Sequence, residues 1–216
     1  MMNSVKVLLI LFLFINTKVM AQSLPVDTFN SNDVQKPLIF YLTGDGGMNN
    51  FSRSFVKEWN SKGYPVAALN IKSYLWKGKT PDKAAADITG LLRRYINDWK
   101  RQSVVLIGYS LGADILPFVQ TRLAADVSNH VSDVVLISPS ATTDFKVHLL
   151  YGSDGVNVPA EINKLTKPTL VLFGNNEKNV PEKSIINKHV AILKVPGDHH
   201  YNNEVAMLVQ QITDRL

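Results

Sequence analysis

The sequence predicts one α/β domain in which helices cover both faces of a mostly parallel β-sheet. From Pro37 onward, short apolar runs alternate with longer segments of helical periodicity, which is typical of parallel strands joined by helical crossovers. The length of 216 residues fits one domain with a substantial core. The apolar runs that we expect to form strands span residues 36–42, 66–69, 104–107, 134–137, 169–173 and 190–195.

Signals for helices lie between these runs. Aromatic residues at helical spacing predict a helix over residues 51–59. Thr80 followed by Pro81 predicts the start of a second helix, because threonine caps helices and proline fits the first helical position. A third helix is expected from residue 111 to about residue 125, with a bend at Pro117. The closing helix is marked by the apolar residues Val205, Leu208, Val209 and Ile212.

The most informative motif, Gly108-Tyr109-Ser110-Leu111-Gly112, lies directly after the expected strand 104–107. A strand, a Gly-x-Ser-x-Gly turn and a helix in this order form the nucleophile elbow of α/β-hydrolases. The sharp turn strains the backbone of the serine, and the glycines on both sides let neighbouring backbone pass without a Cβ clash. An ordinary glycine-rich turn is the alternative, but the flanking strand and helix favour a nucleophilic Ser110.

A serine nucleophile needs an acid that orients its base, and α/β-hydrolases place the acid after a late strand. Glu177 lies three residues after Gly174, which follows the expected strand 169–173. The alternative is a solvated carboxylate on a surface loop. The next acidic residues, Glu182 and Asp154, lie away from any strand end. We therefore predict that Glu177 is the acid of a Ser-His-Glu triad.

The base is expected after one further strand, residues 190–195. His199, two residues after Gly197, is the first choice, since an imidazole on this loop can accept the serine proton while its other nitrogen donates to the acid. His200 is the alternative base, because adjacent loop side chains point in different directions. If His199 is the base, His200 packs beside it or contacts the substrate.

Acyl transfer also requires hydrogen-bond donors for the developing oxyanion. The backbone N–H of Leu111, directly after the nucleophile, is one predicted donor. The second is expected in the glycine-rich loop 43–47 that follows strand 36–42, and we assign it to the backbone N–H of Asp45.

Two sequence features suggest non-hydrolytic kinds of site. Gly44-x-Gly46 after a strand suggests a dinucleotide-binding loop, but Asn49 stands where the third glycine belongs. Asp198-His199-His200 suggests a metal site, but the chain has no second ligand cluster and no His-Glu-x-x-His motif. We therefore expect neither a metal nor a cofactor.

The first residues have the pattern of a secretory signal peptide. Lys6 precedes an uncharged run over residues 7–15, and small residues lead to a cleavage site after Ala21. The run is shorter than the roughly 20 residues that span a bilayer. Residues 1–21 are thus predicted to be removed, residues 22–35 to form a flexible lead-in, and residues 36–216 to form the hydrolase domain, which is periplasmic or secreted.

The net charge limits the kinds of partner that the sequence predicts. The net charge is +5, and without Lys6 and Lys18 it becomes +3, from 21 basic and 18 acidic residues. This mild excess suits peripheral contact with an anionic membrane surface but is too small to indicate nucleic acid, and the sequence carries no signal for an oligomeric state. The segment 138–167, where such folds insert a lid, has about thirty residues, so we expect a short lid and an open site.

Several motifs resemble the VirJ/AcvB family of bacterial virulence proteins. The elbow continues into Ala113-Asp114 and an apolar pair before Pro117, as it does in that family. Similar motifs recur in family order over about residues 36–216: Leu42 to Gly47, Phe145 to His148, Gly174-x-x-Glu177 and Gly197 to His200.

The resemblance implies a periplasmic α/β-hydrolase. AcvB-type members are associated with hydrolysis of aminoacylated phosphatidylglycerol, chiefly lysyl-phosphatidylglycerol, and VirJ-type members with virulence and secretion of DNA-transfer substrates. The chain departs from the family in having Met48 where a tryptophan is usual, and one copy of a domain that longer members carry twice. Asp45 and Asp114 are candidates to meet the substrate's ammonium groups, with a structural carboxylate as the alternative for Asp114.

We therefore expect an aminoacyl-phospholipid hydrolase in which Ser110 attacks the ester carbonyl. A general carboxylesterase or acyl hydrolase acting on soluble substrates is one alternative, because the same triad serves it. A non-catalytic periplasmic binding or secretion-associated module is the other. The presence of Ser110, Glu177 and His199 together argues against that module, since binding requires none of them.

Overall fold

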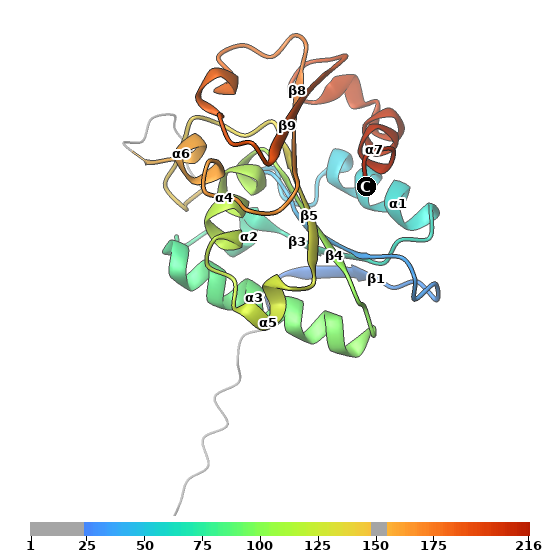
Figure 1. The fold of residues 1–216 in the computed structure, drawn as a ribbon. Helices are drawn as coiled ribbons and strands as arrows, with labels where there is room; N and C mark the ends of the chain where they lie inside the picture. The colour runs from blue at the N-terminus through green and yellow to red at the C-terminus, as the bar shows by residue number, and fades with distance from the viewer. Residues whose placement is uncertain (1–23, 148–154) are drawn as a thin grey trace, which may run out of the picture.

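The computed structural model describes residues 24–147 and 155–216. Within them, seven strands form one sheet in the order β1-β3-β2-β4-β5-β8-β9 (Figure 1). All neighbouring strands are parallel except β1, which pairs antiparallel with β3 at one edge. The predicted mostly parallel sheet is confirmed. Its strands are β1 (Val26–Phe29), β2 (Leu38–Leu42), β3 (Val66–Leu69), β4 (Val104–Tyr109), β5 (Val131–Ile137), β8 (Thr169–Gly174) and β9 (Val190–Val195).

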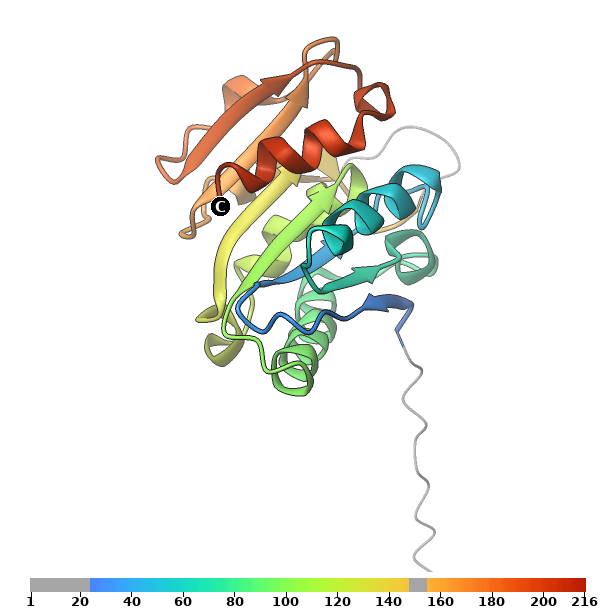
Figure 2. The same ribbon diagram turned by 90° about the vertical axis from the view of Figure 1, so that its right-hand side faces the viewer.

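Helices cover both faces of this sheet (Figure 2). α1 (Asn50–Ser61) and α7 (Val205–Thr213) pack against each other and against one face. α3 (Pro81–Asp98), α4 (Leu111–Gln120) and α6 (Val158–Ile162) pack on the other face. Because successive strand residues point to opposite faces, a strand covered on both sides is apolar throughout, and every residue of β2 is buried.

The helix starts follow their capping residues. The hydroxyl oxygen of Thr80 accepts a hydrogen bond from the amide of Lys83, and Pro81 is the first residue of α3, as predicted. The side chain of Asn49 accepts from the amide of Ser52 at the start of α1. Asn49, which stands where a dinucleotide-binding loop would have its third glycine, therefore caps the helix that follows the glycine-rich loop.

The predicted helix from residue 111 to about residue 125 is wrong at its end. α4 stops at Gln120, and a separate short helix, α5 (Ala125–Ser128), follows. Just beyond α4, the hydroxyl of Thr121 donates to the carbonyl oxygen of Pro117 and to the carboxylate of Glu161 in α6. This side chain ties the helix end to α6 instead of continuing the helix.

The prediction of a flexible lead-in over residues 22–35 is corrected for residues 26–29, because β1 pairs residue by residue with β3, whereas residues 22 and 23 lie outside the described residues. The pairing satisfies backbone groups of an otherwise open sheet edge. The buried guanidinium of Arg101 donates to the carbonyl oxygens of Ser31 and Asp33 and holds the next turn. Three of the four β1 residues are exposed, which explains why composition alone suggested a loose segment.

The predicted signal peptide, residues 1–21, lies outside the described residues and stays a prediction.

The expected short lid, residues 138–167, contains β6 (Thr142–Thr143) paired antiparallel with β7 (Val156–Asn157), followed by α6. Residues 148–154, with His148 and Asp154, are outside the description too. Over residues 24–147 and 155–216, no helix has the length and apolar character that a membrane crossing needs.

Candidate active site

The turn between β4 and α4 has the geometry of a nucleophile elbow. Ser110 has φ 51° and ψ −119°, a conformation that residues with side chains rarely adopt. A Cβ on Gly108 would collide with the carbonyl of Gly112, and a Cβ on Gly112 would collide with the carbonyl of Leu42. The two glycines thus let the turn close against the end of β2, with the strained serine at the start of α4.

The structure brings Ser110, His199 and Glu177 together at the carboxyl edge of the sheet. Nε2 of His199 lies 3.0 Å from Oγ of Ser110, and Nδ1 lies 2.6 Å from Oε1 of Glu177. The three residues come from the segments after β4, β9 and β8. His200 is exposed and makes an edge contact with the His199 ring, with centroids 5.5 Å apart. The geometry thus selects His199 rather than His200 as the imidazole between serine and carboxylate.

The Glu177 carboxylate is held by further hydrogen bonds. Its Oε2 accepts from the amide of Gly174 and from the hydroxyl of Ser138, each at 2.8 Å. Burial acts to raise the pKa of Glu177, but the hydrogen bonds from His199, Gly174 and Ser138 outweigh it and lower that pKa. The acid is therefore held in its ionised form, which can stabilise an imidazolium.

Glu177 and Tyr109 act on different parts of His199, the ring and the backbone carbonyl. The hydrogen bond to Glu177 raises the pKa of His199, against the opposing effect of burial, and the negative charge of Asp45 adds to the rise. The hydroxyl of Tyr109 donates to the backbone carbonyl of His199 at 3.0 Å. Burial in turn raises the pKa of that tyrosine, which keeps it a neutral donor.

The glycine-rich loop after β2 runs beside Ser110. Its turn is closed by a hydrogen bond of 3.0 Å from the amide of Gly47 to the carbonyl of Gly44. A Cβ on Gly44 would lie 3.3 Å from Cβ of Ser110, so a side chain here would crowd the serine. Leu111 begins α4, where first-turn N–H groups have no intrahelical acceptor. Both predicted oxyanion donors, in Asp45 and Leu111, thus belong to segments that meet at Ser110.

Asp114 and Asp45 differ sharply in exposure. Asp114 is 4% exposed, and its Oδ1 accepts from the backbone amide of Ser140 at 2.6 Å. Burial raises the pKa of Asp114 to about 7, although hydrogen bonds to Ser140 oppose the rise. This position favours the structural alternative for Asp114 over contact with substrate. Asp45 is exposed at the site.

Within the described residues, no group of three or more histidines and carboxylates has metal-binding geometry.

Sequence reasoning missed two residues that support the acid. Ser138, at φ 53°, donates to Glu177, and the hydroxyl of Tyr201 donates to Ser138 in turn. Ser138 directly follows the expected strand 134–137, so its place at the carboxyl edge was a usable signal. Tyr201 gave no such signal, because it reaches the site through a turn in which residues 201–203 all have positive φ.

Solved structures with the same architecture include esterases and another hydrolase. Est1E from Butyrivibrio proteoclasticus, with ferulic acid bound, has a TM-score of 0.65 and 15% identity, covering 89% of this chain and 93% of its own. An esterase from Pyrococcus furiosus has a TM-score of 0.64 and 14% identity, covering 89% and 91%. A structure from Klebsiella pneumoniae, titled as a putative dienelactone hydrolase, has a TM-score of 0.63 and 13% identity. It covers 89% of this chain and 97% of its own. At such identities the likeness shows the α/β-hydrolase fold.

The family comparison is more specific. No curated protein sequence matches the chain. The model of the bacterial virulence protein family VirJ matches residues 36–216, which contain every strand of the main sheet except β1 and all three triad residues. The chain therefore belongs to the VirJ family.

Proposed function

We propose that this protein is a serine hydrolase that cleaves a carboxylic ester with Ser110, His199 and Glu177. The observation that carries the proposal is the unbroken chain of contacts from Ser110 Oγ to His199 Nε2, at 3.0 Å, and from His199 Nδ1 to Glu177 Oε1, at 2.6 Å. The strained φ of Ser110 and the glycine-rich loop beside it are the further features that an acyl-transfer site requires.

The geometry supports a two-step reaction. Neutral His199 accepts the Ser110 proton as the oxygen attacks the ester carbonyl, and the resulting oxyanion faces the backbone N–H groups of Leu111 and Asp45. Collapse breaks the bond to the leaving alcohol, which receives the proton from His199. A water molecule then attacks the acyl-enzyme with His199 again as base, and Ser110 recovers its proton as the carboxylic acid leaves. Glu177 stabilises the imidazolium in both steps.

For the substrate we propose an aminoacyl-phospholipid, in particular lysyl-phosphatidylglycerol, so that lysine and phosphatidylglycerol are the products. Membership of the VirJ family supports this choice. The exposed carboxylate of Asp45 lies close enough to His199 to raise its pKa, and it offers a partner for a substrate ammonium group. The predicted signal peptide, residues 1–21, supports a periplasmic location, where the outer leaflet of the inner membrane is accessible.

Release of lysine tests this proposal. Purified protein is incubated with lysyl-phosphatidylglycerol in detergent micelles, and free lysine is measured by mass spectrometry. We expect release that is abolished in Ser110→Ala. An Asp45→Asn variant is expected to lose more activity on the lysyl lipid than on the alanyl lipid, which has one ammonium group fewer. Active enzyme that releases no amino acid from either lipid would contradict the substrate assignment.

A general carboxylesterase acting on soluble esters is the second candidate. Its support is the fold shared with esterases, because the neighbours include Est1E and the Pyrococcus furiosus esterase. Rapid hydrolysis of short p-nitrophenyl esters without activity on aminoacyl lipids would favour it. The other alternative, a non-catalytic binding module in the periplasm, requires an unreactive Ser110.

A further inference from the structure

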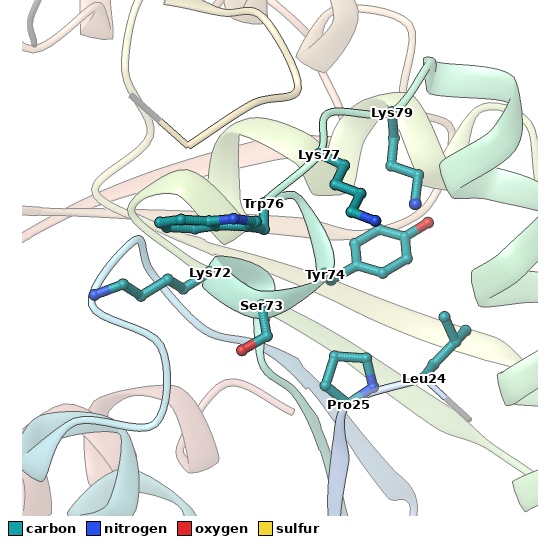
Figure 3. A pocket seen from close by; sticks show the side chains of 8 residues that line it. All are labelled: Leu24, Pro25, Lys72, Ser73, Tyr74, Trp76, Lys77 and Lys79. Carbon is teal, nitrogen blue, oxygen red and sulfur yellow. The ribbon is translucent and has the colours of Figure 1, made fainter. Parts of the chain in front are cut away.

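A basic groove with an exposed tryptophan lies beside the candidate active site. It encloses about 580 Å³, and Figure 3 shows its lining. The lining residues, all in the described part of the chain, include three lysines and no acidic side chain: Leu24, Pro25, Lys72, Ser73, Tyr74, Trp76, Lys77 and Lys79. We call this feature the lysine–tryptophan groove.

The groove is built where two chain segments meet at the edge of the sheet. β1 is antiparallel to β3, so Leu24 and Pro25, just before β1, lie at the carboxyl end of β3. There the amide of Asn70 donates to the carbonyl of Pro25 at 2.9 Å. The side chain of Asn70 accepts from the amide of Ser73 and caps the short helix α2 (Ile71–Tyr74) that forms the groove wall.

The groove and the nucleophile share one edge of the sheet. The amide of Ile71, at the start of α2, donates to the hydroxyl of Thr43 at 3.0 Å, and Thr43 precedes the glycine loop that runs beside Ser110. β3 and β4 are separated only by β2, so two strand spacings, on the order of 10 Å, part the end of β3 from Ser110. A surface that covers the groove therefore comes close to the serine.

The chemistry of the groove matches an anionic lipid surface. Trp76 is 58% exposed and shares the groove lining with three lysines, so an apolar ring and positive charges face the same space. Lys79 lies over the Tyr74 ring, 5.2 Å from its centroid, and the Tyr74 hydroxyl donates to Asp87, whose charge is paired with Lys83. Indole rings favour the interface between headgroups and acyl chains, and lysines contact lipid phosphates.

We propose that the lysine–tryptophan groove docks the protein onto a phospholipid surface rich in phosphatidylglycerol. Phosphate groups contact Lys72, Lys77 and Lys79, and the indole of Trp76 enters the interfacial region. The inference deepens the proposed function, on which it rests, since docking brings a lipid ester to Ser110 without removing the lipid from the membrane.

The directions of the lysines favour an extended surface over one small anion. In Figure 3 the amino groups of Lys77 and Lys79 point toward the Tyr74 ring, whereas Lys72 extends the opposite way, below the indole of Trp76 in this view. A site for a single phosphate would converge its donors on one point. Charges spread on both sides of an exposed indole instead suit many headgroups in a plane.

Vesicle binding tests the proposal without interference from hydrolysis. Ser110→Ala protein without the predicted signal peptide, residues 1–21, is sedimented with vesicles of phosphatidylcholine, with or without an equal amount of phosphatidylglycerol. We expect binding that requires phosphatidylglycerol and weakens with added salt, because lysine contacts are screened. The combined change Lys72→Gln, Lys77→Gln and Trp76→Ala is expected to weaken binding at least roughly tenfold.

A matched control changes the same kinds of residue at the opposite edge of the sheet. Ile186 is 83% exposed, and it lies with Lys183 and Lys188 in the segment that leads into the amino end of β9. Lys183→Gln, Lys188→Gln and Ile186→Ala together remove the same charge and one exposed apolar side chain. This variant is expected to bind within about twofold of the parent. Circular dichroism melting is used to check that both variants are folded.

Trp76 fluorescence gives a second readout. We expect a blue shift on adding phosphatidylglycerol vesicles, and its loss in Trp76→Phe, because Trp59 is fully buried and Trp99 packs partly buried against the core. Equal loss of binding in the groove and control variants, or no binding to the vesicles, overturns the proposal. If the protein binds soluble polyglutamate but not the vesicles, the docking proposal is wrong and the groove is reassigned to an acidic polypeptide.

Failure of docking and failure of the proposed function give different results. Lysine release from lysyl-phosphatidylglycerol in detergent micelles does not require a membrane. If micellar substrate is hydrolysed but vesicles are not bound, the docking inference is wrong and the proposed function stands. If vesicles are bound through the groove but no aminoacyl lipid is hydrolysed, the substrate assignment is wrong.

Discussion

Ser138 donates its hydroxyl hydrogen to the carboxylate of Glu177 over 2.8 Å, and it thereby ties the end of β5 to the acid of the triad. The same hydroxyl oxygen accepts from Tyr201, so an ordered chain of hydrogen bonds runs from Tyr201 through Ser138 and Glu177 to His199 and Ser110. The backbone of Ser138 is held in a left-handed conformation at φ 53°. This relay is a positioning device for the acid, because none of its outer members touches the reacting atoms.

Ser138→Ala is expected to lower kcat/KM for a soluble ester by about 10–100-fold, the size of a lost hydrogen bond to a charged group. The loss should fall on kcat rather than KM, and the midpoint of the pH–rate profile should shift, because Glu177 holds His199 less firmly. Ser138→Thr, which keeps the hydroxyl, should recover part of the rate. An unchanged profile would show that Ser138 has only a structural role.

The pH–rate profile follows from the pKa of His199, which the hydrogen bond to Glu177 raises above 6.5. The base must be neutral to accept the Ser110 proton, so kcat/KM should rise with pH, with a midpoint above about 6.5. Nuclear magnetic resonance titration of His199 in Glu177→Gln should show a lower midpoint, since the main cause of the rise is gone. His200→Gln is the control, and an equal fall in that variant would contradict the account.

Stability should depend on pH through Asp114. Burial raises the pKa of its carboxyl from 3.8 to about 7, so between these values the folded protein keeps a proton that the unfolded chain has released. Stability therefore falls as pH rises through this window. Asp114→Asn keeps an acceptor for the Ser140 amide but cannot ionise. Its melting temperature should fall less between about pH 5 and about pH 8 than that of the wild type, and parallel curves would contradict this.

Two glycine substitutions should have opposite effects. A Cβ at Gly112 collides with backbone of β2, so Gly112→Ala should lower the free energy of unfolding by about 1–3 kcal/mol or more and abolish hydrolysis. At Gly90, inside α3, an added Cβ would meet nothing within 4 Å beyond its chain neighbours and the backbone of its own helix. Gly90→Ala should raise the free energy of unfolding by roughly 0.5–1 kcal/mol. Urea unfolding measures both, and a well-tolerated Gly112→Ala would argue against the tight elbow.

The triad residues could be predicted because each follows the carboxyl end of a strand in a fixed chain order. That rule found Ser110, Glu177 and His199 from local patterns alone. It made His199 the first choice and left His200 as the alternative base, since which imidazole meets Ser110 depends on the turn that follows Gly197. It also could not pair Ser138 with Glu177, because 39 residues separate them in the chain.

The fold was predictable where apolar runs are continuous and less so at the edge. β1 exposes three of its four residues, so its polar composition hid a strand. That omission also hid the groove, because Leu24 and Pro25 reach it only through the antiparallel pairing of β1 with β3. Asp114 looked like a site residue from its place in the elbow helix, and only packing shows that its carboxylate is buried against Ser140.

Reaction with a fluorophosphonate probe tests the nucleophile most directly, since the probe bonds covalently to an activated serine oxygen. Digestion and mass spectrometry of the labelled protein should place a single adduct on Ser110. The adduct should be absent in Ser110→Ala and should form far more slowly in His199→Ala. A wild-type protein that stays unlabelled, or an adduct that persists in Ser110→Ala, would contradict the hydrolytic account.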